Sequence, residues 1–308
     1  MKKVLVTCPP MLRQLTRFSE MFLKFNFDVT APDVVQTLSE EELIELVPAH
    51  DGWIIGDDPA TARVFEAGKA GRLKAAMKWG VGVDNVDFKA CEDLGISIAN
   101  TPGMFGAEVA DIAICYLIGT ARNVFYIDRE IRAGGWPKPA GISLSGRTVG
   151  VVGLGDIGSN VAKRAAALDL NIVGWDPAAG LVPEYVRHKT WPEGIGECDF
   201  IVFACALNKV TKHIFNMQLL SLLKPGVRIV NISRGGLIDE KALLIGLEEG
   251  KVASAALDVF ESEPLELSHP LREHKQLIFG SHNSSNTSDA VIRTSEKALQ
   301  MMKDFLNG

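Results

Sequence analysis

The sequence predicts an α/β protein with two doubly wound parallel sheets. Short β-branched runs recur along the chain and alternate with helical stretches, the pattern of parallel sheets covered on both faces. The run Val149–Val152 lacks polar alternation, as expected of a strand buried on both faces. Two sheets fit the number of runs better than one. The runs are Val4–Thr7, Trp53–Ile55, Ile96–Ala99, Thr148–Val152, Ile172–Trp175, Phe200–Phe203, Val227–Ile232, Ala255–Val259 and Leu277–Phe279.

The composition is that of a folded protein. The chain has 308 residues, enough for two domains or one large domain, and 47% of them are hydrophobic and 23% charged. The net charge is -6 and no block of basic residues occurs, so we expect neither nucleic acid nor a membrane surface as a partner. No run approaches the ~20 apolar residues of a membrane span. Pro9 and Pro10 interrupt the N-terminal apolar run before it could serve as a signal peptide.

Cysteine usage indicates a reducing compartment. The five cysteines are odd in number and scattered, and no Cys-x-x-Cys pair suggests zinc binding or redox chemistry. We therefore expect free thiols, no metal site and a cytoplasmic location. The cysteines are Cys8, Cys91, Cys115, Cys198 and Cys205.

Two long helical stretches define the expected domain organisation. The segment Asn100–Asn123, opened by Thr101-Pro102-Gly103, carries apolar residues at helical spacing and precedes a glycine-rich turn. It is the natural connector from a first domain to a nucleotide-binding domain. The closing stretch Asp289–Leu306 is also helical, and we expect it to return to the first domain.

The strand Thr148–Val152 runs into a Gly-x-Gly-x-x-Gly turn, and an alanine-rich helical stretch, Ser159–Leu168, follows. The first glycine permits the tight turn, the second lets the backbone approach a pyrophosphate, and the third lets helix and strand pack closely. The helix N-terminus supplies amides for the anion. A flexible turn is the alternative, but the flanking strand and helix favour dinucleotide binding. The predicted cofactor-binding residues are Gly153, Gly155, Asp156, Ile157 and Gly158.

Asp176 follows the next strand, where a carboxylate binds the ribose hydroxyls and repels a 2′-phosphate. The sequence therefore predicts NAD rather than NADP as the cofactor. Taken alone, Asp176 could be a solvated turn residue before Pro177.

Several motifs occur in an order that resembles the D-isomer-specific 2-hydroxy acid dehydrogenases, nearest to the phosphoglycerate dehydrogenase and glycerate or hydroxypyruvate reductase branches. The resemblance covers nearly the whole chain. It implies an NAD-binding Rossmann domain over residues 100–285, a flavodoxin-like substrate domain over residues 1–99 and 286–308, and hydride transfer between NAD and a small 2-hydroxy acid. The motifs are Gly80–Asp87, Asn100–Gly103, Gly153–Gly158, Asn231–Gly236, Asp258–Pro264 and Ser281–His282.

The resemblance assigns the catalytic roles to Arg234, Glu263 and His282. Imidazole changes charge near neutral pH, so His282 suits proton transfer to the carbonyl oxygen. A carboxylate behind the ring, Glu263, would fix its tautomer and favour the imidazolium. The guanidinium of Arg234 offers a bidentate fork to the substrate carboxylate. Taken singly, each could be a structural residue or a surface ion-pair partner.

Further contacts follow from the same resemblance. The backbone amides of Val81 and Gly82 are expected to bind the substrate carboxylate, and Asp258 the nicotinamide carboxamide. Ile232 and Cys205 are expected to line the cofactor cleft. A glycine-rich bend and buried strand ends are the alternatives. A homodimer is also expected, both from the apolar connector Met104–Asn123 and from the association that the resemblance implies.

The chain departs from the family pattern at several positions. Asp156 places an acid beside the expected pyrophosphate, where it would weaken binding. Ala206 and Asn208 stand where proline and threonine are usual, and Ser281 replaces a common proline. These changes affect the expected cofactor contacts, whereas the proposed catalytic residues match the family pattern.

The substrate is open on sequence alone. Where the phosphoglycerate branch has a basic patch, this chain reads Gly56-Asp57-Asp58-Pro59, which favours a small unphosphorylated acid. Arg63 or Lys78 could compensate if the loop folds toward the cleft, so phosphoglycerate dehydrogenase activity stays an alternative. An NAD-sensing corepressor-like binding protein is a second alternative. Formate oxidation is disfavoured because the expected insertions are absent.

Overall fold

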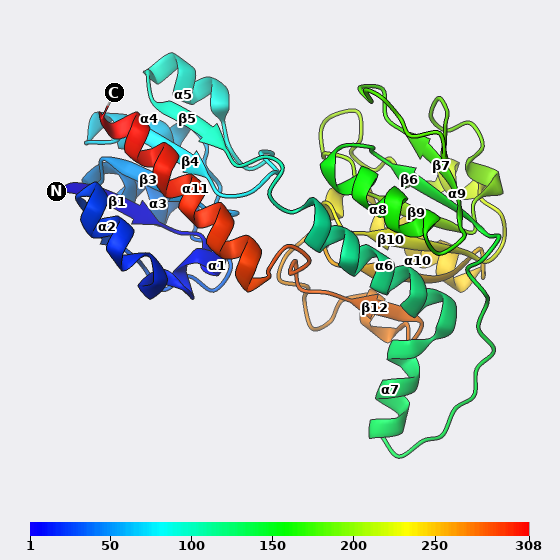
Figure 1. Ribbon diagram of the computed structural model, residues 1–308. Helices are drawn as coiled ribbons and strands as arrows, with labels where there is room; N and C mark the ends of the chain where they lie inside the picture. The colour runs from blue at the N-terminus through cyan, green and yellow to red at the C-terminus, as the bar shows by residue number, and fades with distance from the viewer. Residues whose placement is uncertain (308) are drawn as a thin grey trace. The chain divides into compact units, whose positions relative to one another are not determined.

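A computed structural model describes residues 1–307, and the chain divides into two compact units (Figure 1). Unit 1 comprises residues 1–104 and the segment that begins at Asn286, and unit 2 comprises Phe105–Ser285. Each unit is a parallel sheet with helices on both faces, so the predicted fold class is confirmed. The sequence placed the first boundary after residue 99, whereas the structure assigns residues 100–104 to unit 1.

Unit 1 contains a five-stranded sheet in the order β2-β1-β3-β4-β5, and every neighbouring pair is parallel. This is the flavodoxin-like order, in which the winding direction reverses between the first and third strands. Ligands of such sheets bind outside the carboxyl ends of the strands near that reversal. The strands are β1 Lys2–Val6, β2 Phe27–Thr30, β3 Gly52–Ile55, β4 Ala75–Lys78 and β5 Ser97–Asn100.

Helices cover both faces of the unit 1 sheet. On one face, α3 to α5 enclose a core that includes Trp53 and Phe65, both fully buried. On the other face, α11 packs so closely that a Cβ added at Gly52 would lie 2.5 Å from the Met302 sulfur. The helices are α1 Pro9–Leu12, α2 Ser19–Phe25, α3 Glu40–Leu46, α4 Ala62–Ala70, α5 Phe88–Leu94 and α11 Ser288–Asn307.

Unit 2 contains a seven-stranded parallel sheet in the order β12-β11-β10-β9-β6-β7-β8. Renumbered within the unit, this is the 3-2-1-4-5-6 order of dinucleotide-binding domains with a seventh strand added. The winding direction reverses between β6 and β9. The strands are β6 Thr148–Val152, β7 Asn171–Trp175, β8 Val186–His188, β9 Phe200–Phe203, β10 Val227–Asn231, β11 Val252–Leu257 and β12 Leu277–Phe279.

The helices of unit 2 also form two layers. α6 packs against α8 and against β10 to β12 on one face, while α9 and α10 lie over the core of the other face. α7 and the chain after it extend away from these layers (Figure 1), and no residue of α7 is buried. The helices are α6 Gly106–Arg122, α7 Val124–Arg132, α8 Asp156–Ala166, α9 Met217–Leu222 and α10 Glu240–Glu248.

Local signals explain where several helices begin and end. The Ser39 hydroxyl and the Glu42 carboxylate form a capping box at the start of α3. The Asp239 carboxylate accepts two backbone N–H groups at the start of α10. α6 ends at Asn123, which adopts the left-handed conformation with φ of 58°.

Three strands were not predicted from the sequence, and the connector was only partly right. β2 is short and alternates polar residues, β4 is alanine-rich and ends in a lysine, and β8 has three residues at a sheet edge. The connector was expected as a helix over Asn100–Asn123, but β5 extends to Asn100 and α6 begins only at Gly106.

Candidate active site

The glycine-rich turn after β6 has the geometry that a dinucleotide requires. Gly153 has φ of +93°, and an added Cβ would lie 2.7 Å from the Cys205 backbone. At Gly158 an added Cβ would lie 1.8 Å from the Gly153 carbonyl oxygen, so helix and strand pack too closely for any side chain. At Gly155, by contrast, nothing lies within 4 Å of an added Cβ. Gly155 is the N-cap of α8, so this open space lies at a helix N-terminus suited to a phosphate group.

The Asp156 carboxylate is turned toward a neighbouring helix. A Cβ added at Gly106, the first residue of α6, would lie 2.3 Å from an Asp156 carboxylate oxygen. A carboxylate is favoured at a helix N-terminus, so α6 supplies a reason for the acid that the sequence left unexplained. Ile157, the next residue of the turn, is half-buried.

Asp176 lies directly after β7 and is tied to the glycine-rich turn. One carboxylate oxygen accepts the Leu154 N–H at 2.8 Å and the other accepts the Ala178 N–H at 2.8 Å. His188 at the end of β8 lies 3.0 Å from the Asp176 carbonyl oxygen through Nε2. The carboxylate is therefore held beside the turn, where the ribose of a dinucleotide is expected.

The segment after β10 forms a compact loop that carries Arg234. The buried Asn231 accepts the Ser233 N–H at 3.2 Å and donates to the Arg234 carbonyl at 2.8 Å. The Ser233 hydroxyl donates to the Cys205 carbonyl at 2.6 Å, which joins this loop to the end of β9. Ile232 is 5% exposed, and burial raises the pKa of the Cys205 thiol to about 11. Cys205 is therefore a neutral thiol near pH 7.

Asp258 follows β11, is 3% exposed, and organises the chain after β12. Its carboxylate accepts the N–H of Asn283 at 3.3 Å and of Ser284 at 3.0 Å. Its carbonyl accepts the His282 N–H at 2.7 Å. Asp258 itself donates to the Asn231 carbonyl at 2.9 Å, so the ends of β10, β11 and β12 are joined through one residue.

Glu263 and His282 form a close pair within unit 2. His282 Nδ1 lies 2.7 Å from one Glu263 oxygen, and the other oxygen accepts the Phe260 N–H at 2.9 Å. The two side chains are 21% and 24% exposed, so the pair is largely shielded from water. His282 adopts the left-handed conformation with φ of 55°, which the surrounding hydrogen bonds must hold.

Backbone packing brings the Arg234 loop against the Glu263 loop. A Cβ added at Gly235 would lie 1.8 Å from the Phe260 carbonyl carbon, so only glycine fits between the two segments. Arg234, Glu263 and His282 thus lie at the carboxyl ends of three adjacent strands, where ligands of doubly wound sheets bind.

Val81 and Gly82 lie in unit 1, after the carboxyl end of β4. Gly80 precedes them with φ of +124° and donates its N–H to the Thr101 hydroxyl at 2.8 Å. Asn100 donates to the Val81 carbonyl at 3.0 Å. Within residues 1–307, neither the Val81 nor the Gly82 N–H has a hydrogen-bond acceptor, as an anion-binding role requires.

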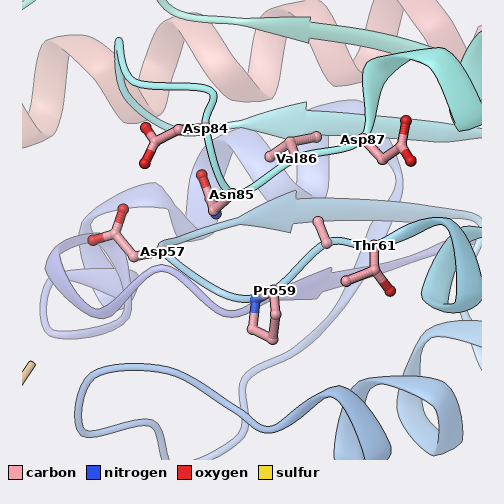
Figure 2. A pocket seen from close by; sticks show the side chains of 8 residues that line it. Asp57, Pro59, Thr61, Asp84, Asn85, Val86 and Asp87 are labelled. Carbon is pink, nitrogen blue, oxygen red and sulfur yellow. The ribbon is translucent and has the colours of Figure 1, made fainter. Parts of the chain in front are cut away.

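A pocket of about 430 Å³ opens in unit 1 beside this segment. Figure 2 shows its two walls, the loop after β3 with Asp57 and the loop after β4 with Asp84. Asn85 donates to the carbonyls of Gly56 and Asp58, which ties the two walls together. The lining residues are Asp57, Pro59, Ala60, Thr61, Asp84, Asn85, Val86 and Asp87.

The two acids after β3 have different environments. Asp57 lines the pocket and is 41% exposed. Asp58 is fully buried, and its carboxylate accepts the N–H groups of Leu38 and Gly56 and the Thr7 hydroxyl. Burial raises the pKa of the Asp58 carboxyl, although these donors oppose the shift. Of the two acids that stand where the phosphoglycerate branch has a basic patch, Asp57 lines the pocket, whereas Asp58 is buried and was wrongly expected to face a phosphate.

Lys78 and Arg63, the two cations that could have offset the acids of the pocket, are both engaged in ion pairs. Lys78 is 2% exposed, and its ammonium donates to the Gly56 carbonyl and, at 3.0 Å, to Asp57. Arg63 pairs with Glu40 on the surface of unit 1. Each cation is thus paired with a nearby carboxylate within unit 1.

Tyr116, in the apolar connector Asn100–Asn123, was not singled out from the sequence. The Tyr116 hydroxyl lies 3.4 Å from an Asp258 carboxylate oxygen, and the side chain is buried. A tyrosine on a helix face that is otherwise apolar was the available signal, because a buried hydroxyl needs a partner.

Among residues 1–307, no group of three or more His, Cys, Asp or Glu side chains has an arrangement that could hold a metal ion. Over the same residues, every helix is too short or too polar to cross a bilayer.

Comparison with known proteins shows the family to which the chain belongs. The family model described as "D-isomer specific 2-hydroxyacid dehydrogenase, NAD binding domain" matches residues 114–284. The chain is 35% identical over 318 aligned positions to D-3-phosphoglycerate dehydrogenase of Methanocaldococcus jannaschii, covering 100% of this chain and 58% of that protein. It is 37% identical over 264 positions to hydroxypyruvate reductase of Thermotoga maritima, covering 83% of this chain and 85% of that protein.

Among solved structures, the TT0316 protein of Thermus thermophilus superposes with a TM-score of 0.88 at 29% identity, covering 99% of this chain and 97% of that one. The chain spans only about half the length of several of the phosphoglycerate dehydrogenases that it matches. The hydroxypyruvate reductase, in contrast, is matched over most of its length.

Proposed function

Since the chain belongs to the D-isomer specific 2-hydroxyacid dehydrogenase family, we propose that it transfers a hydride between NAD(H) and a small 2-hydroxy or 2-oxo acid of the D series. The observation that carries this proposal is the 2.7 Å pair of Glu263 and His282. The pair lies at the carboxyl end of the unit 2 sheet, beside the loop that bears Arg234. A histidine oriented by a carboxylate is the arrangement that reversible proton transfer requires.

The residues of unit 2 fit the cofactor. Gly155 and the α8 N-terminus would hold the pyrophosphate, and Asp176 the adenosine ribose. Ile232 and Cys205 would border the nicotinamide half, with Asp258 receiving its carboxamide. When bound, the reduced cofactor supplies a hydride and leaves as NAD⁺.

His282 is assigned the proton. As hydride reaches the carbonyl carbon of a 2-oxo acid, the electron pair of the C=O bond moves to oxygen, which must gain a proton. Since Nδ1 of His282 faces Glu263, Nε2 is the nitrogen assigned to this transfer. Glu263 keeps the ring oriented and stabilises the imidazolium, while the reverse reaction returns the proton to His282.

Arg234 is assigned the substrate carboxylate. A guanidinium binds a carboxylate through two parallel hydrogen bonds, which fixes the plane of the substrate as well as its position. The amides of Val81 and Gly82 are proposed to contact the same group. Their N–H groups have no acceptor within the described chain, and this supports the assignment.

The proposed substrate is a small unphosphorylated 2-oxo acid such as glyoxylate or hydroxypyruvate. A phosphate dianion needs paired cations. Asp57 lines the unit 1 pocket, whereas Lys78 is buried against Asp57 and Arg63 pairs with Glu40. Phosphoglycerate dehydrogenase is the second candidate activity, because several relatives carry that name.

The assembly and location are further parts of this proposal. We expect a homodimer that uses α7 and the chain after it, because no residue of this helix is buried, Val124 in the helix is 50% exposed and Trp136 beyond it is 79% exposed. Large apolar side chains exposed on one segment are a feature of association surfaces. The five free thiols support a cytoplasmic location.

Steady-state oxidation of NADH against a panel of 2-oxo acids tests the function. The panel contains glyoxylate, pyruvate, hydroxypyruvate and phosphohydroxypyruvate, and chiral chromatography identifies the product. We expect turnover of at least one unphosphorylated acid to the D-hydroxy acid. NADH binding without turnover of any acid would instead favour the corepressor-like alternative, and an L product would contradict the stereochemical assignment.

A further inference from the structure

Tyr116 and Asp258 form a buried polar pair, and the proposed mechanism gives Tyr116 no role. The Tyr116 hydroxyl, on α6, lies 3.4 Å from one carboxylate oxygen of Asp258. The two residues are 7% and 3% exposed. A buried hydroxyl or carboxylate without a hydrogen-bond partner destabilises the folded state. The contact between Tyr116 and Asp258 is therefore favourable for both groups.

Asp258 in turn holds three consecutive backbone N–H groups. Those of Asn283 and Ser284 end on its carboxylate, and that of His282 ends on its carbonyl. The left-handed conformation of His282 is costly for a non-glycine residue and persists only where its surroundings fix it. The Asp258 carboxylate is therefore the anchor of the segment that carries the proposed proton donor.

Steric constraints keep this pair in place. A Cβ added at Gly280 would lie 2.0 Å from the Asp258 oxygen that faces Tyr116 and 2.5 Å from the Tyr116 hydroxyl. The Tyr116 ring also contacts Phe125 in an edge-on arrangement with centroids 6.5 Å apart. Phe125 itself packs on Gly119, where an added Cβ would lie 2.6 Å from its ring. These contacts restrict the positions that the Tyr116 ring and its hydroxyl can adopt.

We propose that Tyr116 is a positioning residue: its hydroxyl orients the Asp258 carboxylate, and Asp258 thereby fixes the backbone of His282 for proton transfer. The proposal rests on the proposed function only for its kinetic consequence. Its structural consequence, a backbone segment at residues 282–284 that depends on a distant hydroxyl, holds whatever the substrate is.

The test compares Tyr116→Phe with wild type. Phenylalanine keeps the buried ring and its contact with Phe125 and removes only the hydroxyl. Tyr185→Phe is the matched control, since Tyr185 is 45% exposed in a loop of the same unit. Asp258→Asn is a second variant that weakens the same anchor from the other partner. All four proteins are examined as full chains.

Two measurements are made on each protein. Hydrogen–deuterium exchange of the cofactor-free protein reports the amides of Asn283 and Ser284. Steady-state kinetics with NADH and hydroxypyruvate report kcat, KM and the solvent isotope effect on kcat. A displaced proton donor slows the chemical step and makes proton transfer more rate-limiting, whereas it leaves the carboxylate contacts of the substrate intact.

For Tyr116→Phe we expect about threefold to tenfold faster exchange at Asn283 and Ser284, the effect of one lost hydrogen bond. We expect a fall in kcat of similar size, a KM for hydroxypyruvate within about twofold of wild type, and a larger solvent isotope effect. Asp258→Asn should also speed exchange at these two amides. Tyr185→Phe should match wild type in both measurements.

Unchanged exchange and kcat in Tyr116→Phe would overturn the proposal, and so would faster exchange spread over the whole of α6 and the sheet. Faster local exchange with an unchanged kcat would remove the link to proton transfer. If the wild type reduces no 2-oxo acid, the proposed function fails, while the exchange data still decide whether Tyr116 holds the His282 segment.

Discussion

The Glu263 carboxylate faces His282 Nδ1 at 2.7 Å with one oxygen and accepts the Phe260 N–H at 2.9 Å with the other. The carboxylate is thus oriented by the backbone of its own loop before it meets the imidazole. Such a pre-oriented acceptor selects the tautomer of the ring and stabilises its charged form. The contribution of this pair is expected to depend on pH, because the carboxylate acts on the imidazolium.

Glu263→Gln should lower the pH at which 2-oxo acid reduction fails. Reduction needs the protonated imidazole, and the amide of glutamine removes the charge that favours it. An opposite charge at this distance displaces such a titration by about one unit or more. The measurement is kcat/KM against pH, with the exposed Glu266→Gln as control. An alkaline limb that stays in place would show that Glu263 does not act on the proton donor.

His282→Ala should reduce kcat by about 10²- to 10⁴-fold, the usual contribution of a general acid–base residue. NADH affinity should stay near that of wild type, because the imidazole is assigned to the substrate oxygen and not to the cofactor. Steady-state assays give kcat, and a fluorescence titration with NADH gives the Kd for NADH. The control is His274→Ala, since His274 lies in a loop before β12. A variant that retains full turnover would remove His282 from the mechanism.

The fold was largely predictable because its strongest signals are local. Runs such as Val149–Val152 are apolar at every position, and the glycine-rich turn combines three glycines with a strand and a helix. β4 was missed because an Ala-Ala-Met-Lys run has low β propensity, and only its burial between β3 and β5 makes it a strand. In such cases tertiary context overrides propensity.

The pairing of Glu263 with His282 was predictable, whereas the contacts that support the candidate site were not. His282 and Glu263 are 19 residues apart, and the resemblance to a family was needed to pair them. Neither the Tyr116–Asp258 contact nor the burial of Asp58 has a sequence signal of its own, because both depend on which helix or loop packs over the strand end. Contacts of this kind are determined by tertiary packing between segments that are far apart in the sequence.

Asp176→Asn should weaken the discrimination between NADH and NADPH. The substitution keeps an acceptor for the Leu154 N–H but removes the negative charge that a 2′-phosphate would meet. A charge about 4 Å from a phosphate is worth ~1–4 kcal/mol near a protein surface. The ratio of kcat/KM with NADH to kcat/KM with NADPH should therefore fall by about tenfold or more. The control is the exposed Glu184→Gln. Equal use of both cofactors by wild type would contradict the role of Asp176.

Asp199→Asn should destabilise unit 2 at neutral pH. Its side chain is 10% exposed and pairs with Lys224 at 2.8 Å and Arg147 at 2.9 Å, while it also accepts the Thr148 N–H. Burial alone would raise the pKa of the Asp199 carboxyl, but these partners outweigh it and hold the pKa below its ordinary value. Loss of the charge-assisted hydrogen bonds should cost about 1.5–3 kcal/mol.

The sign of the pH dependence follows from that lowered pKa. The stabilisation is fully present above the unfolded value near pH 4 and is lost as the pH falls through the lower folded value. The Tm difference between Asp199→Asn and wild type should therefore be large at pH 7 and shrink below about pH 4. Asp128→Asn, at an exposed pair with Arg132, is the control and should change Tm little. A difference independent of pH would contradict the charge-based account.

Phosphohydroxypyruvate should be a poorer substrate than hydroxypyruvate, by about tenfold or more in kcat/KM at low ionic strength. Asp57 lines the unit 1 pocket, while the nearby Lys78 ammonium is buried and already donates to Asp57. An approaching phosphate dianion therefore meets the Asp57 carboxylate while the Lys78 ammonium is already engaged, and one such repulsion is worth ~1–4 kcal/mol at about 4 Å. Added salt should narrow the difference, since exposed charges are screened.

Asp57→Asn separates this explanation from one based on size alone. Removal of the charge releases the Lys78 ammonium from its ion pair, so kcat/KM should rise for the phosphorylated compound and change little for hydroxypyruvate. Glu66→Gln, on the exposed side of α4, removes an equal charge away from the pocket and should alter neither. If wild type prefers phosphohydroxypyruvate, phosphoglycerate dehydrogenase becomes the leading activity. If Asp57→Asn leaves the discrimination unchanged, the phosphate is excluded by shape and not by the Asp57 charge.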